Sequence, residues 1–450
     1  MKRQNLNMTQ GHPGRLLMVF ALPLMAGNVF QQLYTVVDTA IVGRGVGMDA
    51  LAALGSVDWM NWMFLGIAQG FGQGFSVRMS QKYGQKDAEG LRRTLGVSAR
   101  LTVIIAVVVT LAAQLLVGLF FRLLQVPDQL WDTAMLYSRI ILLGIPAMLY
   151  YNYTASVLRA VGDSQTPLQA MVAAALTNIA LDCLAVFWLD WGVAGAAAAT
   201  VLSQCLAGTL CAVKIFRSPQ LRFTRQHMVH DGLLSRNLMG LGLPVAAQNV
   251  IIAVGGMAVQ SVVNGFDTPF IAGFTASNKL YGILEIAAIS YGYAVTTYTG
   301  QNYGAMNWDR IRSGTNWALV ISLATSALIA GAMIAFGRSI TMLFISSESA
   351  ELAAAAGQTA YLYLSVMAMM LPVLYLLYAY RSALQGMGNT RIPLLSGVVE
   401  FAIRVCGAAI IGFTGWQNGI FYAEVGAWVG AAVLLAAAYY HQVSKLGRKK

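Results

Sequence analysis

Apolar stretches long enough to cross a bilayer recur along this chain from one end to the other. An α-helix needs about 20 residues to span the hydrocarbon core of a membrane. Only 10% of the 450 residues are charged, whereas a soluble domain carries about a quarter, and the alternating pattern of a β-barrel is absent. The sequence therefore predicts an all-α polytopic membrane protein with twelve transmembrane helices, at 16–42, 51–77, 95–120, 133–158, 168–188, 193–214, 237–263, 271–297, 314–337, 353–380, 393–413 and 420–442.

The chain also repeats itself once. Gly-Gln-Asn-Tyr-Gly at 300–304 resembles Ser-Gln-Lys-Tyr-Gly at 80–84, and Leu243-Pro244 resembles Leu22-Pro23. A second series follows in the same order at constant spacing: Tyr137, Pro146, Gly162 and Pro167 recur as Tyr363, Pro372, Gly388 and Pro393. Because each half holds six spans, an even number, both halves enter the membrane from the same side, as in parallel repeats.

The repeat predicts two pseudo-symmetric six-helix bundles. The N-lobe would cover residues 1–225 with helices 1–6, and the C-lobe 226–450 with helices 7–12. The polar stretch 215–236 is the expected linker,. Two bundles of this kind would leave a central cleft for a transported substrate.

The net charge of +11 is explained by membrane topology. The Lys and Arg residues concentrate in loops on one side of the predicted bilayer, for example Arg78, Lys82, Arg92, Lys214 and Arg222. The positive-inside rule makes that side cytoplasmic. We therefore expect a multi-pass protein of the cell's inner (plasma) membrane with both termini cytoplasmic, with membrane lipids rather than nucleic acid as surroundings.

Four oxygen-bearing side chains are expected at one depth in the N-lobe. Asp38 lies on the first predicted helix, Asn178 and Asp182 lie four residues apart on one face of the fifth, and Thr200 lies on the sixth. Charged groups in hydrocarbon are costly and usually mark an ion or proton pathway. One carboxyl could hold a proton, or the four oxygens could hold Na⁺, and the sequence does not choose. The alternative for Asp38 is a helix-end aspartate that reaches outer water.

Pro23 lies on the same helix as Asp38 and can bend it, although a simple kink would explain it equally well. On the eighth predicted helix, Glu285 with Tyr281, Tyr291 and Tyr293 could form a negative, aromatic wall for an organic cation. Core packing would also produce such a tyrosine stripe.

Other polar or soft side chains have simpler expected roles. Met60 and Met63 are further candidates for the substrate cleft, with anchoring at the membrane interface as the alternative. Glu400 and Arg404, four residues apart, are expected to neutralise each other. Glu424 lies toward a helix end, where we expect it to be hydrated.

Patterns for enzymatic chemistry are missing. The sequence contains no nucleotide-binding loop, nucleophile elbow, zinc-protease motif or dinucleotide fingerprint in a suitable setting,. We expect no enzyme activity and no cofactor, and no metal beyond Na⁺ at the four N-lobe residues. Secondary active transport coupled to H⁺ or Na⁺ is the leading interpretation, and a membrane-embedded enzyme is the least supported.

At the level of motifs, the chain resembles the multidrug and toxic compound extrusion (MATE) family over nearly its whole length. The resemblance rests on Pro23 and Asp38, Gln81-Lys82-Tyr83-Gly84, Asn178-x-x-x-Asp182, Gly192-x-x-Gly-Ala-Ala-x-x-Thr200 and Gln301-Asn302-Tyr303-Gly304. It implies a two-lobed, twelve-helix antiporter that expels small-molecule drugs or toxic organic cations in exchange for Na⁺ or H⁺. The family's cation residues then correspond to Asp38, Asn178, Asp182 and Thr200, and we expect a monomer.

One departure bears on the branch of the family. The NorM-like branch has an acidic residue eight positions after the proline of helix 7, where this chain has Ile252 after Pro244. The tenth span also lacks a carboxylate between Tyr361 and Tyr380. The chain is therefore more similar to MepA- or DinF-like exporters. Related lipid-linked-oligosaccharide or lipid flippases are the alternative, and the scarcity of in-membrane cations (Arg100, Arg139, Lys279, Arg404) argues against them.

Overall fold

The computed structural model describes residues 6–123, 126–342 and 350–447, and α-helices make up most of these ranges. The two chain ends, for which a cytoplasmic location is predicted, lie outside the described residues. The helices are α1 Pro13–Gly45, α2 Met48–Ser56, α3 Asp58–Gly84, α4 Ala88–Leu123, α5 Trp131–Leu143, α6 Ile145–Ala160, α7 Gln165–Cys183, α8 Gly192–Arg217, α9 Gly232–Val263, α10 Thr268–Gly304, α11 Trp308–Met342, α12 Ala350–Gly386, α13 Arg391–Thr414 and α14 Gly419–Gly447. Three short turns complete the order: η1 Asp128–Leu130, η2 Leu184–Trp188 and η3 Arg225–Met228.

The predicted spans coincide with helices along the whole chain. Within the described ranges, nine helices are long and apolar enough to cross a membrane, and the bent pair of α5 and α6 gives a tenth. The other two predicted spans fall on α3 and α10, which are 27 and 37 residues long. The all-helical, twelve-span prediction is therefore confirmed as a fold class.

The predicted span 133–158 is not one continuous helix. The chain breaks at Gly144 and bends by 42° between α5 and α6. Pro146 lies in the first turn of α6, where a missing backbone N–H costs little. A Cβ at Gly144 would lie 2.3 Å from Cγ2 of Val201 on α8, so glycine lets α8 approach the break closely.

Backbone geometry confirms the internal repeat. Lys86 and Met306, at matching positions after the two Tyr-Gly motifs, have φ angles of 59° and 57°. Gly162 and Gly388, a second matched pair, have φ of 88° and 86°. Positive φ is uncommon for residues other than glycine, so its occurrence at equivalent places shows that the two halves use the same helix ends.

The chain forms two compact units. Unit 1 comprises Met1–Asn7 and Leu22–Ala246, and unit 2 comprises Met8–Ala21 and Ala247–Lys450. Helices α1 and α9 thus each divide between the units, within a few residues of Pro23 and Pro244. The lobe boundary at residue 225 stays a prediction.

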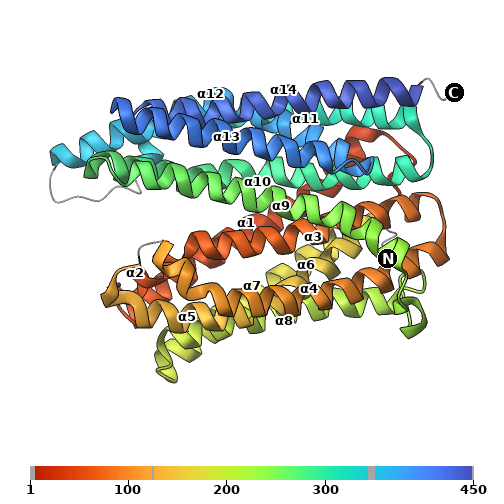
Figure 1. The fold of residues 1–450 in the computed structure, drawn as a ribbon, viewed down its shortest axis with the longest axis horizontal. Coiled ribbons are helices and arrows are strands. Elements are labelled where there is room, and N and C mark those ends of the chain that lie inside the picture. Colours follow the sequence, from red (N-terminus) through yellow and green to blue (C-terminus); the bar gives the residue numbers. More distant parts are fainter. Residues whose placement is uncertain (1–5, 124–125, 343–349, 448–450) are drawn as a thin grey trace. The chain divides into compact units, whose positions relative to one another are not determined.

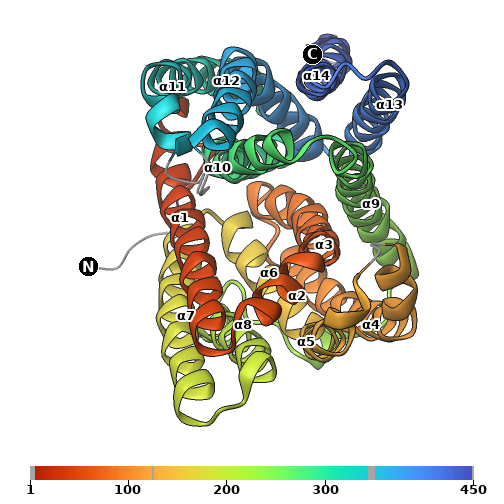
Figure 2. The same cartoon turned by 90° about the vertical axis from the view of Figure 1, so that its left-hand side faces the viewer.

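The two units pack their helices in the same pattern. In unit 1, α6 packs on α3, α4 and α8, and α7 packs on α8; in unit 2, α12 packs on α10, α11 and α14, and α13 packs on α14. Figure 1 shows α13 alongside α14, and Figure 2 shows α7 beside α8 when viewed along the helices. Equivalent helices therefore have equivalent neighbours, as expected for a duplicated six-helix bundle.

Small residues bring α3 and the start of α9 into close contact. A Cβ at Gly70 would lie 2.4 Å from Cα of Ala246, and a Cβ at Gly74 would lie 2.4 Å from Cα of Gly242. Close backbone approach at small residues is the usual basis of helix association in membranes. The glycine-rich stretch 70–74 is thus a packing surface.

A candidate cation-coupling site

Two carboxyl groups from different helices meet in unit 1. Asp38 is contributed by α1 and Asp182 by the last turn of α7, and their side chains lie within hydrogen-bonding reach of each other. Asp38 is seven residues before the end of α1 at Gly45. The position of Asn178 one turn before Asp182 places its amide on the same face of α7.

These polar groups are buried without hydrogen-bond partners. Asp182 is 0% exposed and Asn178 2% exposed. Both carboxyl oxygens of Asp182, Oδ1 of Asp38 and both amide atoms of Asn178 lack a hydrogen-bond partner. Two ionised carboxylates cannot satisfy one another, because neither carries a donor. One positive charge between them, a proton or a small cation, would supply what both lack.

Two tyrosines that the sequence interpretation missed also lie near this pair. Tyr34 on α1 and Tyr137 on α5 both experience the charges of Asp38 and Asp182. Tyr34 precedes Asp38 by one helical turn, a spacing that could have indicated it. Tyr137 matches Tyr363 in the repeat, but no spacing along the chain relates Tyr137 to Asp38.

The fourth predicted residue, Thr200, lies on α8, which packs on α7. Its hydroxyl donates to the Ala196 carbonyl at 3.1 Å, within its own helix. The hydroxyl proton of Thr200 is therefore engaged, and its oxygen can only accept a hydrogen bond or bind a cation. Among the described residues, no group of three or more His, Cys, Asp and Glu is arranged to hold a metal ion.

A π-helical turn directly follows Asp182. The α7 helix ends at Cys183 and continues as η2, in which Leu189 N donates to Leu184 O at 3.0 Å. A Cβ at Gly45 would lie 2.2 Å from Cγ1 of Val186, so the end of α1 packs tightly on this turn. Such turns occur frequently at functional sites, and here one extends the helix of Asp182 and packs on the end of the helix that carries Asp38.

The predicted cleft residues fall in both units. Met60 and Met63 on α3 are buried in unit 1. In unit 2, Tyr281 stacks on Trp428 with ring centroids 5.7 Å apart, and buried Tyr291 shares a hydrogen bond with Thr325 at 2.9 Å. Tyr293 is half-buried on α10. Their role in a cleft stays a prediction.

The expected pairing of Glu400 with Arg404 is confirmed in part, and the expected hydration of Glu424 was wrong. Arg404 pairs chiefly with Glu424, donating from Nε at 2.9 Å and from Nη2 at 2.7 Å. Glu400 lies 3.4 Å from Arg404 and makes its shorter contact with Arg381 of α12. Glu424 is paired with Arg404 rather than hydrated, and its side chain is only 15% exposed. Arg381 lies one residue beyond the predicted span 353–380, which explains why the sequence interpretation omitted it.

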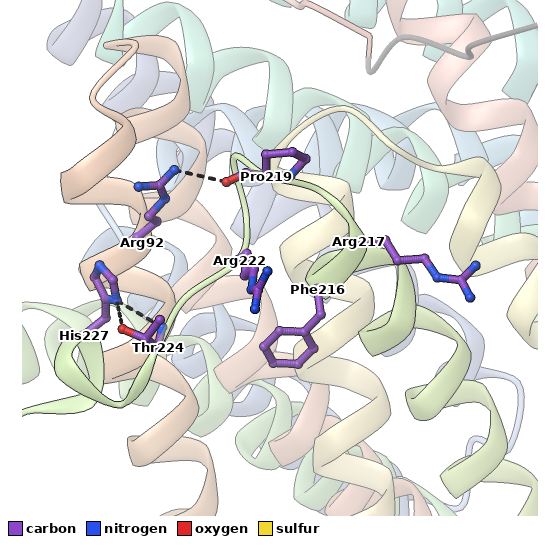
Figure 3. A pocket seen from close by; sticks show the side chains of 7 residues that line it. All are labelled: Arg92, Phe216, Arg217, Pro219, Arg222, Thr224 and His227. Atoms are coloured by element: carbon purple, nitrogen blue, oxygen red, sulfur yellow. Dashed lines mark hydrogen bonds between the residues drawn. The ribbon is translucent and has the colours of Figure 1, made fainter.

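A separate pocket lies at the linker of unit 1, away from the carboxyl pair. It has a volume of about 340 Å³ and is lined by Arg92, Phe216, Arg217, Pro219, Arg222, Thr224 and His227. Figure 3 shows Arg92 donating to the Pro219 carbonyl at 3.0 Å, whereas Arg217 points away from the other side chains. These contacts tie the linker to α4.

These features define a class: a polytopic helical membrane protein of two like-built six-helix units with buried, unpaired carboxyl groups, as expected of a secondary transporter. The model of the MatE family matches residues 23–184 and 244–410, one segment in each half. The chain therefore belongs to the MatE family.

Curated relatives and solved structures agree with this. The chain is 29% identical over 342 residues to the probable multidrug resistance protein YpnP of Bacillus subtilis (strain 168), covering 76% of this chain and 77% of the relative. It is 27% identical over 343 residues to YoeA of the same organism, also a probable multidrug resistance protein, covering 74% of each. Relatives named MepA and NorM both occur. The fold matches an outward-facing multidrug resistance MATE family transporter with a TM-score of 0.90, 22% identity and full coverage of both chains.

Proposed function

We propose that this protein is a secondary active multidrug exporter, which expels organic, often cationic compounds in exchange for H⁺ or Na⁺. The observation that carries the proposal is the pair of Asp38 and Asp182, three of whose carboxyl oxygens are buried and lack donors in a chain of apolar helices. Asn178 and Thr200 complete the coupling site. The printed names of the relatives supply the substrate class.

Of the two coupling ions, H⁺ is favoured by one geometric feature. The carboxyl groups of Asp38 and Asp182 reach each other directly, the arrangement in which two acids share a single proton. Na⁺ is the second candidate, because carboxylate, amide and hydroxyl oxygens together suit a hard cation. For Na⁺, the Thr200 oxygen would have to join the pair.

The proposed coupling uses the bend at Pro23. A positive charge bound between Asp38 and Asp182 removes the need to solvate their negative charge. The outer part of α1 can then pack against its neighbours in unit 1, and the drug is released outward. Pro23 lies where α1 passes from one unit to the other, so a change of bend there would alter both.

The driving force is adequate. One charge that moves through a 100 mV potential supplies about 2.3 kcal/mol. Since about 1.4 kcal/mol corresponds to a factor of ten, one coupled charge supports accumulation on the order of 40-fold for an uncharged substrate. The exchange of one H⁺ or Na⁺ for a monovalent organic cation moves no net charge, and the concentration gradient of the coupling ion then supplies the driving force.

The branch and the rival function follow from the same residues. Ile252 replaces the acidic residue of the NorM-like branch, so we place the chain with the MepA- or DinF-like exporters. A lipid-linked-oligosaccharide flippase would need free cations for pyrophosphate. Arg381 and Arg404 are instead engaged by glutamates, which disfavours that function.

The oligomeric state and the membrane location of the protein complete the proposal. We propose a monomer in the plasma membrane, with both termini cytoplasmic and lobes at 1–225 and 226–450. Candidates for contact with the substrate are Met60 and Met63 in unit 1 and Tyr291 and Tyr293 in unit 2, whereas Tyr281 and Glu285 contact each other.

Ethidium efflux from vesicles tests the function, with a pH gradient and a sodium gradient applied separately. Asp38→Asn is expected to abolish gradient-driven efflux at unchanged expression. Asp190→Asn is the matched control, because Asp190 is exposed and has a φ of 55°, which asparagine tolerates. Parental efflux by the Asp38 variant, or equal efflux with all gradients dissipated, would refute the proposal.

A further inference from the structure

Unit 2 contains its own group of largely buried charges on α12, α13 and α14. Arg381, Glu400, Arg404 and Glu424 form a chain of ion pairs across α12, α13 and α14. Two guanidinium groups and two carboxylates cancel. Removing one partner of a buried ion pair is strongly destabilising, because the other charge is left without compensation. We therefore treat this chain of ion pairs as fixed and neutral.

Glu285 on α10 is outside this balance. Its Oε1 accepts a hydrogen bond of 2.5 Å from the Tyr378 hydroxyl, and the Tyr281 hydroxyl is its second partner. Hydroxyl groups stabilise a carboxylate but do not cancel its charge. Lys279 on the same helix is exposed, so among the enclosed charges of unit 2 that the structure describes, ionised Glu285 adds one negative charge that the four paired groups do not balance.

The surroundings of Glu285 suit a proton better than an organic cation. An organic cation would bind over the open face of an aromatic ring. The Tyr281 ring is already covered by Trp428, at 5.7 Å between centroids. The Tyr378 ring faces the Arg381 guanidinium, whose Cζ lies 5.5 Å from the ring centroid. A proton needs no open face.

We propose that Glu285 is a second proton-binding residue of this transporter, acting in unit 2 in addition to the Asp38–Asp182 pair. The inference rests on the proposed export function and deepens it by adding a second coupled proton. Binding and release of that proton change the buried charge of unit 2 between zero and minus one. The electric field at Arg381 and Arg404 changes with it.

The titratable and charged groups around Glu285 are contributed by α10 itself and by the helices around it. They are Lys279, Tyr281, Tyr291 and Tyr293 on α10, Tyr375, Tyr378 and Arg381 on α12, Glu400 and Arg404 on α13, and Glu424 on α14. Lys279 is exposed and lies six residues before Glu285, a spacing that does not place the two side chains on one face of the helix,. Helix α11 carries its charged side chains near its ends: Asp309, Arg310, Arg312 and Arg338. The described cations near Glu285 are therefore those already held by Glu400 and Glu424.

Infrared difference spectroscopy of the purified protein during a pH titration tests this without any substrate. Protonated carboxyl groups absorb in the C=O stretching region, and we expect Glu285→Gln to remove one titrating band while Asp38→Asn removes a different one. The amide of Gln keeps an acceptor for Tyr378. An unchanged set of bands in Glu285→Gln, or a band that responds to sodium rather than to pH, would overturn the proposal.

A second pair of variants keeps the carboxyl in place. Tyr378→Phe removes a donor to the ionised form, so the Glu285 band should titrate at higher pH. Tyr291→Phe is the matched control, because its hydroxyl bonds Thr325. Equal midpoints in both variants would refute the assignment of the band to Glu285.

Transport supplies the final measurement. At a pH difference of one unit, each coupled proton multiplies the limiting accumulation by about ten, so Glu285→Gln should lose about tenfold. Unchanged accumulation would refute the coupling. If the wild-type protein moves no dye although the Glu285 band titrates, the export function fails and the proton site stands.

Discussion

Asp182→Asn separates a functional from a structural role for the buried acids. Three oxygens of the Asp38–Asp182 pair lack donors in this structure, and each unsatisfied buried polar group costs about 1–3 kcal/mol. An asparagine at position 182 carries a permanent N–H donor for Asp38 and has no charge of its own. We therefore expect the variant to be as stable as the wild type or more stable, by about 1–3 kcal/mol.

Transport should change in the opposite direction. The amide cannot bind and release a proton, so the variant is expected to lose gradient-driven dye accumulation, about tenfold for each coupled proton at a pH difference of one unit. Stability is measured by tryptophan fluorescence during unfolding in detergent, and transport by dye efflux from vesicles. Equal or higher stability together with lost transport is the result expected for a residue that is retained for function at a cost in stability.

One result would show that the Asp38–Asp182 pair is structural. If Asp182→Asn unfolds more easily by more than about 1 kcal/mol and still accumulates dye, the pair is a structural contact and not a coupling site. Asn178→Ala serves as a companion variant, because it removes the neighbouring amide and leaves both acids.

Three further predictions follow. Pro23→Ala restores a backbone donor in α1 and should slow transport, as measured by initial efflux rates; a parental rate would exclude the bend from the cycle. Glu424→Gln leaves Arg404 without its bidentate partner and should cost about 3–5 kcal/mol of unfolding free energy, whereas a loss below about 1 kcal/mol would show that water replaces the pair. The hydrogen bond from Lys82, followed by one from the backbone, lowers the pKa of Asp87 below its usual range. Its contribution is therefore full above about pH 4 and is lost as the pH falls through the lower folded-state pKa. Asp87→Asn should be less stable than the wild type by about 0.2–1 kcal/mol at neutral pH, with no difference in strong acid, and a difference independent of pH would contradict the ion pair.

The sequence interpretation was accurate where the signal is local or repeated. Hydropathy located the spans because each helix must satisfy its own backbone in lipid. The repeat predicted matching helix ends, which Lys86 and Met306 confirm. The break at Gly144 was not predicted, because a proline in the first turn of a helix and one inside a helix look alike in sequence.

Local spacing was an incomplete guide to charge pairing. Four residues of separation made Glu400 the expected partner of Arg404, and the two form an ion pair at 3.4 Å, yet Glu424 on another helix makes the shorter, bidentate contact. The i, i+4 rule reports only that two side chains share a face. It cannot say which residues a third helix presents to that face.

By itself the sequence determined the membrane class, the duplicated six-helix plan and the acidic residues that are costly to bury. These properties depend on composition and order along the chain. Only the tertiary structure decided that Asp182 meets Asp38, that Tyr34 and Tyr137 lie beside them, and that Glu285 is held by hydroxyls and not by a cation. The physical reason is that the rotation of each helix about its axis, and its choice of neighbours, are set by side-chain packing between segments far apart in the chain.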